Sequence, residues 1–320
     1  MTTATESRIA GATVIANRRI CRDHYRATFR LDAFGAARPG QFVQLSPPAE
    51  FDRATIIDSD ECKSINGADD TAQADAIPFL PRAYSIADVR RAARHVDVDV
   101  IFRVVGLGTR WLRTLRPGHA VTMLGPLGKP FPIDEKRRHA YLVIGGVGLP
   151  PLLWLAEELN AAGKNVTAFC GAQSAELIPL QLSDAIPPDR EGRVAVACAT
   201  EFAEHNVNTV ISTDDGACGF HGHVVQALQV YREANPIPAD DVVVYTCGPE
   251  RMMRAAAEFC AASGITCYVS MERPMACGVG TCQSCIITVR DEERSSGRRY
   301  ALCCTEGPVF DARDVLWDTP

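Results

Sequence analysis

The feature that most constrains this 320-residue chain is a group of closely spaced cysteines near its C-terminal end. Cys277, Cys282 and Cys285 follow the spacing C-x4-C-x2-C, and 18 residues separate Cys285 from Cys304. This spacing is typical of plant-type [2Fe-2S] clusters, in which a loop wraps the cluster and its glycines let backbone amides approach the sulfurs. The pattern predicts a cluster held by Cys277, Cys282, Cys285 and Cys304.

Two alternatives stay open at these cysteines. A structural zinc site usually combines C-x2-C pairs, and only Cys282 and Cys285 form such a pair here, so the spacing favours iron and sulfur. For the last ligand, spacing alone does not separate Cys304 from its neighbour Cys303.

Charge and hydropathy exclude several classes of protein. The net charge of −6 argues against nucleic acid as a ligand, because phosphate backbones attract basic surfaces. The longest apolar stretch, 141–155, is interrupted by Gly and Pro and falls short of the roughly 20 residues of a membrane span. The N-terminus has no signal-peptide pattern, and 13 cysteines, an odd number, do not suggest a disulfide framework. We expect a cytoplasmic protein that binds neither nucleic acid nor membrane.

The first third of the chain shows the patterns of short strands and turns. In the run 95–105, Val and Phe recur at every second position, which is the period of a half-buried antiparallel strand. Shorter strands are expected at 41–45, 83–87 and 120–124. These signals predict a small antiparallel β-barrel. Within it, about 50–78 is rich in Asp and Glu and has little apolar periodicity, so we expect an acidic surface insertion there.

From His139 the pattern changes to alternating strands and helices. One helix is expected to place Leu152, Leu155, Ala156 and Leu159 on one face and to end at Gly163, and a second is expected at 250–263. Strands are expected at 141–144, 165–170, 193–199, 242–245 and 265–270. Strands that are apolar on both faces and alternate with helices predict a parallel sheet covered by helices.

A glycine-rich turn joins the first of these strands to its helix. It contains Gly145, Gly146 and Gly148, and Pro150 and Pro151 follow in the first helical turn. Free amides and the positive end of a helix dipole suit a diphosphate. The turn does not match G-x-G-x-x-G, so a tight packing turn is an equally good interpretation.

The turn Cys247-Gly248-Pro249 follows another strand, at the position where open α/β sheets bind ligands. Taken singly, Cys247 reads more simply as a buried thiol, because free cysteines are often found in cores.

Two segments of the barrel region also carry candidate binding residues. Arg82 offers a guanidinium for a diphosphate, Tyr84 an aromatic face for a flat ring and Ser85 a hydroxyl for a ring nitrogen. Gly108 and Thr109 would form a second phosphate-binding turn. Without other evidence, these segments are read more simply as a strand with a buried Tyr and a hairpin glycine.

These segments, together with GPLGKPF at 125–131, occur in an order that resembles the ferredoxin-reductase superfamily, in which an FAD-binding barrel precedes a nicotinamide-nucleotide domain. With the C-terminal cysteines, the chain resembles the electron-transfer subunits of the NAD-dependent (class 1B) dihydroorotate dehydrogenases. The segment 304–310 matches the end of that family, which favours Cys304 over Cys303 as the fourth ligand. The acidic insertion and Tyr84 depart from the family's usual pattern.

The resemblance implies a multi-domain fold: an antiparallel FAD-binding β-barrel at 1–136, a parallel-sheet NAD-binding α/β domain at 137–268 and a small [2Fe-2S] domain at 269–320. It places the FAD on Arg82, Ala83, Tyr84, Ser85, Gly108 and Thr109. The NAD would lie on Gly145, Gly146, Gly148, Cys247, Gly248 and Pro249. Cys247, Tyr84 and Ser85 are then the candidate catalytic residues.

The resemblance also implies a partner and a direction of electron flow. Electrons would arrive from the FMN of a separate dihydroorotate-oxidising subunit in a heterotetramer, and would pass through the cluster and FAD to NAD+ in pyrimidine biosynthesis. FAD connects the two ends, because it exchanges both single electrons and pairs. The nucleotide is expected to be NAD, because the segment 171–176 has no Arg or Lys for a 2′-phosphate and ends in Glu176.

Two other functions remain open. The small subunit of an NADH-dependent ferredoxin:NADP oxidoreductase or of a sulfide-dehydrogenase-type complex shares this layout, but that group typically has Asp at the position of Cys277. A nucleotide-binding regulatory subunit with a zinc site and no redox activity is the alternative from another class.

Overall fold

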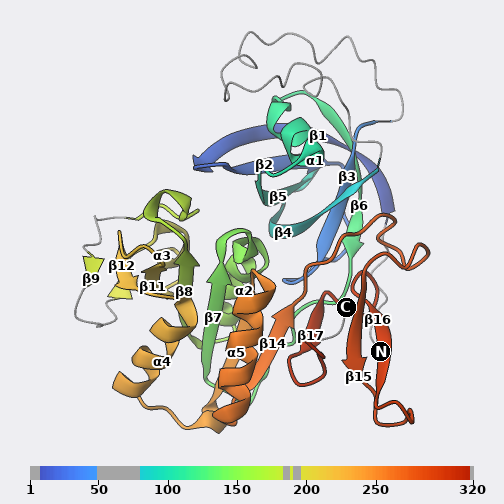
Figure 1. Cartoon of the computed structure of the whole chain (residues 1–320). Coiled ribbons are helices and arrows are strands. Elements are labelled where there is room, and N and C mark those ends of the chain that lie inside the picture. Colours follow the sequence, from blue (N-terminus) through green and yellow to red (C-terminus); the bar gives the residue numbers. More distant parts are fainter. Residues whose placement is uncertain (1–7, 49–79, 183–187, 190–195, 318–320) are drawn as a thin grey trace, which may run out of the picture.

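The computed structural model describes residues 8–48, 80–182, 188–189 and 196–317. The acidic insertion expected at about 50–78 lies outside these residues. An antiparallel barrel, a large mainly parallel sheet with helices and a C-terminal two-stranded sheet follow one another along the chain (Figure 1). The expected fold class is confirmed. No helix in the described part of the chain is long and apolar enough to cross a membrane.

Six antiparallel strands close the barrel in the order β1-β2-β5-β4-β3-β6. They are β1 (Arg8–Cys21), β2 (His24–Leu31), β3 (Phe42–Ser46), β4 (Arg82–Arg91), β5 (Val96–Arg103) and β6 (Ala120–Leu127), and helix α1 (Leu107–Thr114) follows β5. Val98 and Val100 of β5 point into the barrel core with no exposed surface, as the alternating pattern predicted.

The polar face of β5 differs from the prediction. Asp99 is buried, because Nη2 of Arg26 and Nη2 of Arg90 lie 2.6 and 2.7 Å from its carboxylate oxygens. Burial acts to raise the pKa of Asp99, but the hydrogen bond from Arg90 and the charge of Arg26 outweigh it and hold the pKa below its ordinary value. A charged side chain stays buried here because two cations compensate it.

The large sheet has the strand order β17-β14-β13-β7-β8-β11-β12-β9, with β10 paired to β11. Its strands are β7 (His139–Gly145), β8 (Asn165–Ala172), β9 (Pro188–Asp189), β10 (Val196–Ala197), β11 (Asn208–Thr213), β12 (Gly219–His221), β13 (Val242–Cys247), β14 (Thr266–Ser270) and β17 (Val309–Asp311). Its helices are α2 (Leu149–Ala161), α3 (Thr200–Ala203), α4 (Val224–Ala234) and α5 (Glu250–Ala262), with short 3-10 turns η3 (Gly146–Gly148), η4 (Ala175–Leu177) and η5 (Ala239–Asp241).

The helices cover both faces of this sheet. Along β7, Tyr141 and Val143 pack in the cluster of α4 and α5, whereas Leu142 and Ile144 pack in the cluster of α2 and α3. The two-residue period of a strand puts alternate apolar residues on the two covered faces.

Helix α2 is buried on more than the one face that its periodicity predicted. Leu152 and Leu155 face the sheet, whereas Trp154 belongs to the core of the barrel. The helix lies between the two units (Figure 1) and therefore joins the barrel to the sheet.

The prediction that 193–199 forms a strand of the parallel sheet is wrong. Within the described residues, only Val196 and Ala197 form a strand, and they pair antiparallel with β11 at the side of the sheet. On the side of β8 that faces away from β7, the parallel neighbour is β11, a strand that was not predicted from the sequence. Its residues from Thr209 onward are buried, so it is the core strand of this region.

The C-terminal segment contributes to two sheets. Strands β15 (Ile286–Arg290) and β16 (Arg298–Leu302) form an antiparallel pair of their own. Strand β17 joins the large sheet beside β14. The domain boundary expected between residues 268 and 269 falls inside β14, so the cysteine segment begins directly from the end of a strand of the large sheet.

Candidate functional site: a cavity between barrel, sheet and cysteine loop

A cavity of about 520 Å³ lies where the three parts of the chain meet. Its size is within the range of about 300–1,000 Å³ that is usual for ligand sites. It is lined by barrel residues Phe42, Ala83, Tyr84, Ser85, Ile101, Phe102, Arg103, Val105 and Thr109, by Val147 and Pro150, and by the C-terminal residues Ser270–Met275 and Pro308. A bound molecule would therefore touch the barrel, the start of α2 and the segment leading to the cysteines.

Three of the expected FAD-binding residues, Ala83, Tyr84 and Ser85, stand side by side on β4 at this cavity. Tyr84 is 8% exposed, and the edge of its ring meets Phe102 at a centroid distance of 6.1 Å. Its hydroxyl is buried without a hydrogen-bond partner in the described part of the chain, and burial raises its pKa. Tyr84 lines the cavity, but its hydroxyl has no exposed surface there, so a ligand could accept from it only after the side chain moves.

Arg82 and Gly108 meet just beside the cavity. A Cβ at position 108 would stand 2.8 Å from Cγ of Arg82, so the arginine side chain lies directly over the glycine at the start of α1. Nη1 of Arg82 donates to the carbonyl oxygens of Leu80 and Pro81 at 2.9 and 3.2 Å. The structure thus brings the two expected diphosphate-binding segments together.

Thr109 lines the cavity but uses its hydroxyl locally. The Oγ1 atom accepts hydrogen bonds from the amides of Val105 and Gly106 at 2.9 and 3.1 Å and donates to the carbonyl of Gly106 at 2.9 Å. Its role in the fold is to cap the first turn of α1.

The two glycine turns of the sheet pack against each other. A Cβ at Gly148 would overlap the carbonyl oxygen of Cys247, and one at Gly145 would stand 2.7 Å from Cδ of Pro249. Gly248 has a φ of +151° and lies against the backbone of Gly145. Close packing therefore accounts for Gly145, Gly148 and Gly248. A Cβ at Gly146 would meet no atom within 4 Å, so this glycine is the one that faces outward.

Cys247 is buried at the end of β13 behind the cavity wall. Burial raises the pKa of its thiol, and the nearby charge of Glu272 adds to this, whereas a hydrogen bond with Ser270 opposes it. Glu272 itself is exposed to the cavity but surrounded by protein, which raises the pKa of its carboxyl group. The thiol is neutral at physiological pH and does not line the cavity.

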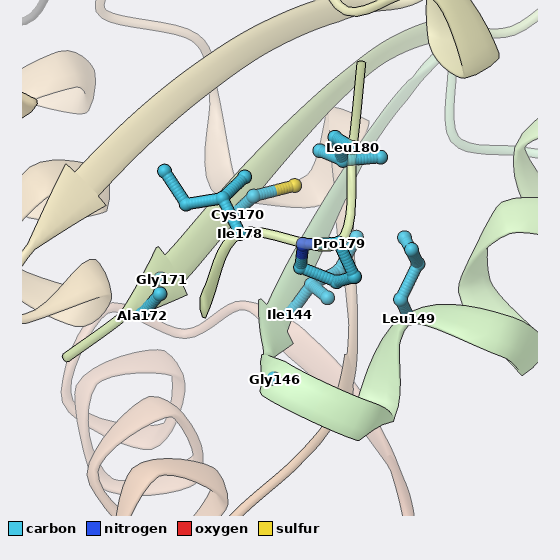
Figure 2. A pocket seen from close by; sticks show the side chains of 9 residues that line it. All are labelled: Ile144, Gly146, Leu149, Cys170, Gly171, Ala172, Ile178, Pro179 and Leu180. Atoms are coloured by element: carbon cyan, nitrogen blue, oxygen red, sulfur yellow. The ribbon is translucent and has the colours of Figure 1, made fainter. Parts of the chain in front are cut away.

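A second, small apolar pocket lies at the carboxyl ends of β7 and β8. Figure 2 shows Gly146 and Leu149 on one side, Cys170, Gly171 and Ala172 at the end of β8, and Ile178, Pro179 and Leu180 around it. Its volume of about 10 Å³ holds no more than one water molecule. The outward-facing Gly146 and the residues after β8 therefore lie next to each other.

The cysteine loop directs backbone amides at its sulfurs. Sγ of Cys277 accepts from the amides of Val279 and Cys282 at 3.5 and 3.4 Å. Gly278 and Gly280 have φ angles of +70° and +87°, a backbone that glycine adopts readily. Such N–H groups around a sulfur are what the motif predicted, and they suit a cluster with bridging and terminal sulfurs.

The four expected ligands form two adjacent pairs. Cys282 lies next to Cys277, and its hydrogen bond with Ser284 is the main cause that lowers its pKa to about 6. Cys304 contacts the thiol of Cys285. Burial is the main cause that raises the pKa of Cys304 to about 11, and the contact with Cys285 is the second. In the described ranges, no three His, Cys, Asp or Glu side chains are grouped for a single metal ion. The pairs fit a cluster in which four cysteines share two irons.

Cys303 and Cys304 differ in their surroundings. Cys304 interacts with Cys285, with Cys277 and with the amide of Gly280. Cys303 has no exposed surface, and burial raises its pKa to about 12, with Arg273 and Glu250 among its charged neighbours. Of the two cysteines, Cys304 is therefore the one that interacts with Cys277 and with the backbone amide of Gly280 in the cysteine loop.

Three residues near the site were missed from the sequence. Gln44 of β3 donates through Nε2 to the carbonyl of Ala276 at 3.1 Å, and its side chain fills the space over Gly278. Glu272 lines the cavity. Arg22, in the turn between β1 and β2, forms an ion pair with Glu176. Only Gln44 left a signal, as a polar residue inside an otherwise apolar strand.

Two family models match the chain. Residues 272–316 match the iron-sulfur cluster binding domain of dihydroorotate dehydrogenase B, and residues 18–130 match the siderophore-interacting FAD-binding domain. The fold and site thus define a flavin-containing electron-transfer subunit of an oxidoreductase, with an FAD-binding barrel and an iron–sulfur domain. The match favours iron and sulfur over the zinc alternative.

Relatives define the family more narrowly. The dihydroorotate dehydrogenase B (NAD(+)) electron transfer subunit of Geobacillus sp. (strain WCH70) is 35% identical over 77% of this chain and 83% of its own length. The corresponding subunit of Geobacillus thermodenitrificans is 31% identical over 95% of this chain and 97% of its own length. The chain belongs to the family of dihydroorotate dehydrogenase B (NAD(+)) electron transfer subunits.

Solved structures share the fold. A chain of NADH-dependent reduced ferredoxin-NADP oxidoreductase superposes with a TM-score of 0.69 at 24% identity, covering 96% of this chain and 90% of that one. The ferredoxin reductase of carbazole 1,9a-dioxygenase superposes with a TM-score of 0.56 at 19% identity, covering 82% of this chain and 68% of that one.

Proposed function

We propose that this chain carries electrons from the FMN of a dihydroorotate-oxidising partner through a [2Fe-2S] cluster and FAD to NAD+. The observation that carries the proposal is the 520 Å³ cavity, because barrel, nucleotide sheet and cysteine segment all contribute to its wall. FAD supplies exchange of both one and two electrons. A flavin held there has the segment that leads to the cysteine loop and the start of α2 as its neighbours.

The chain's own residues bind and orient the groups. On this proposal, the side chain of Tyr84 moves when FAD binds and donates its buried, unpaired hydroxyl to the flavin, and Ser85 lies beside the ring. Arg82 with Gly108 and Thr109 holds the diphosphate. Cys277 and Cys282 bind one iron, and Cys285 and Cys304 the other.

The nucleotide is assigned to the carboxyl edge of the large sheet. The turn at Gly146 and the positive end of the α2 dipole face its phosphates, although Pro150 and Pro151 in the first helical turn have no N–H to donate. Gly145 and Gly148 give the turn its tight packing. Cys247, Gly248 and Pro249 close the side next to the cavity, where the nicotinamide would meet the flavin. Cys247 then acts as a neutral, buried thiol.

The assembly is proposed to be a heterotetramer of two such subunits and two FMN-containing catalytic subunits, located in the cytoplasm. The chain's membership of a family of electron transfer subunits supports a separate catalytic partner. The expected divisions at 136/137 and 268/269 remain proposals for the domain limits.

The test is reconstitution with the catalytic partner. Dihydroorotate should reduce NAD+ only when both subunits are present, and the Cys282→Ser variant should abolish this while FAD stays bound. The second candidate, supported by the fold likeness to NADH-dependent ferredoxin-NADP oxidoreductase, predicts no dihydroorotate-dependent activity but electron exchange with a ferredoxin-linked, NADP-binding partner.

A further inference from the structure

An ion pair joins the barrel to the large sheet at the proposed nucleotide site. The guanidinium of Arg22 contacts the carboxylate of Glu176, and the backbone amide of Arg22 donates to the carbonyl of Glu176 at 3.1 Å. Both side chains remain about half exposed, at 45% and 56%, so solvent and ligands reach them. The two residues are 154 positions apart, and only the folding of the barrel onto the sheet brings them together.

Arg22 and Glu176 lie at the position where nucleotide-binding sheets recognise the ribose of the adenosine. Glu176 belongs to η4, directly after β8, and the next residues, from Ile178 on, border the small pocket beside Gly146 (Figure 2). In such sheets a carboxylate after the second strand binds the ribose 2′-hydroxyl of NAD, and a nearby arginine accepts the 2′-phosphate of NADP. Here both kinds of group are present and each neutralises the other.

The turn that carries Arg22 is held in place. Asp23 has a φ of +61°, and its carbonyl accepts from the amide of Val104 at 2.8 Å. Nδ1 of His24 lies 2.8 Å from the carbonyl oxygen of Arg22. The barrel therefore presents the guanidinium at a defined position.

We propose that Arg22 and Glu176 act together as the determinant of selectivity between NAD and NADP. The inference rests on the proposed nucleotide site and adds its specificity. Glu176 repels a 2′-phosphate, and Arg22 weakens that repulsion while the pair is formed. Removing one member uncovers the charge of the other, so the two substitutions must change selectivity in opposite directions.

The experiment measures binding of NAD+ and NADP+ to the full chain by calorimetry at low ionic strength. In Glu176→Gln, Arg22 is released and the preference for NAD+ over NADP+ should fall by about tenfold, whereas in Arg22→Gln it should rise by about threefold or more. Arg22→Lys keeps the cation and should stay near the original ratio. Both shifts should shrink at high salt, because the groups are exposed.

The pair Arg138 and Asp241 provides matched controls. It is another arginine–carboxylate pair on the same sheet, with Nε of Arg138 3.0 Å from a carboxylate oxygen of Asp241, but it lies at the amino end of β7. Arg138→Gln and Asp241→Asn make the same charge changes and should leave the ratio unaltered. Melting temperatures of all variants report whether the barrel and sheet stay joined.

The outcomes separate the inference from the function on which it rests. Opposite shifts at Arg22 and Glu176 with silent controls support it. Shifts in the same direction, or no shift while NAD+ still binds, overturn it and leave a purely structural clamp. If the original protein binds neither nucleotide, the proposed NAD site itself fails, and the selectivity inference fails with it.

Discussion

The side-chain amide of Gln44 donates a 3.1 Å hydrogen bond to the carbonyl oxygen of Ala276, directly before the first cysteine of the loop. Gln44 is 2% exposed and also fills the space over Gly278. A barrel residue thus holds the conformation of the cysteine loop, which couples the flavin-binding unit to the cluster.

Gln44→Ala should destabilise the cluster without removing FAD. The carbonyl of Ala276 loses a donor and the loop loses its packing, a cost of about 1–3 kcal/mol. The visible absorbance of the cluster should bleach several-fold faster in a chelator. Gln41→Ala is the control, because Gln41 bonds to Gly128 within the barrel. Equal bleaching in both variants would contradict a specific role for Gln44.

Cys304→Ser and Cys303→Ser should behave differently. Cys304 interacts with Cys285 and Cys277, so its replacement should abolish the cluster and its iron content. Cys303 is buried beside them, and its replacement should keep the iron. Iron and sulfide analysis of the two purified variants decides the fourth ligand, and loss of iron only in Cys303→Ser would reverse the assignment.

Tyr84→Phe should have opposite effects on the empty and the flavin-loaded protein. Removing a buried hydroxyl that has no partner should stabilise the FAD-free protein by about 1 kcal/mol. Losing the hydrogen bond to the flavin should weaken FAD binding about fivefold. Melting of the FAD-free form and titration with FAD measure the two effects. Tyr25→Phe is the control, because Tyr25 lies on β2, which is separated from β4 by β5. Unchanged FAD affinity in Tyr84→Phe would remove the hydroxyl from the site.

Gly148→Ala should destabilise the nucleotide unit. The new methyl group overlaps the carbonyl of Cys247, and the backbone has to move, at a cost of at least about 3 kcal/mol. The melting temperature should fall by several degrees. Gly11→Ala, in open space on β1, should change it little. A stable Gly148→Ala protein would show that the two glycine turns are not tightly packed.

Asp99→Asn should weaken the barrel in a pH-dependent way. The pKa of Asp99 is held below its ordinary value, so its stabilisation is present above that value and is lost as the pH falls through the folded-state pKa. The difference from the unmodified protein should be about 2 kcal/mol at pH 7 and should shrink below about pH 4. Urea unfolding at both pH values measures it. Asp97→Asn, whose partner Arg30 is exposed, should cost less than about 1 kcal/mol.

The local patterns of the chain were sufficient for most elements. Alternation in 95–105 and continuous apolar runs at 141–144 and 242–245 predicted β5, β7 and β13, because burial on one or two faces leaves a direct trace in the sequence. The strand at 193–199 was misplaced because a short edge strand and the core strand β11 carry similar apolar content, and only sheet pairing distinguishes them.

Sequence by itself determined the class of chemistry: four cysteines at cluster spacing and an ordered set of barrel and sheet motifs. The tertiary structure decided which residues meet. It placed Gln44 against the cysteine loop and Arg82 over Gly108, and it paired Arg22 with Glu176. It also packed the two glycine turns of the sheet against each other. These relationships join residues far apart in the chain, and their energies come from packing and charge at close range. A motif specifies the chemistry that a residue can perform, and the fold decides which other residues that residue contacts.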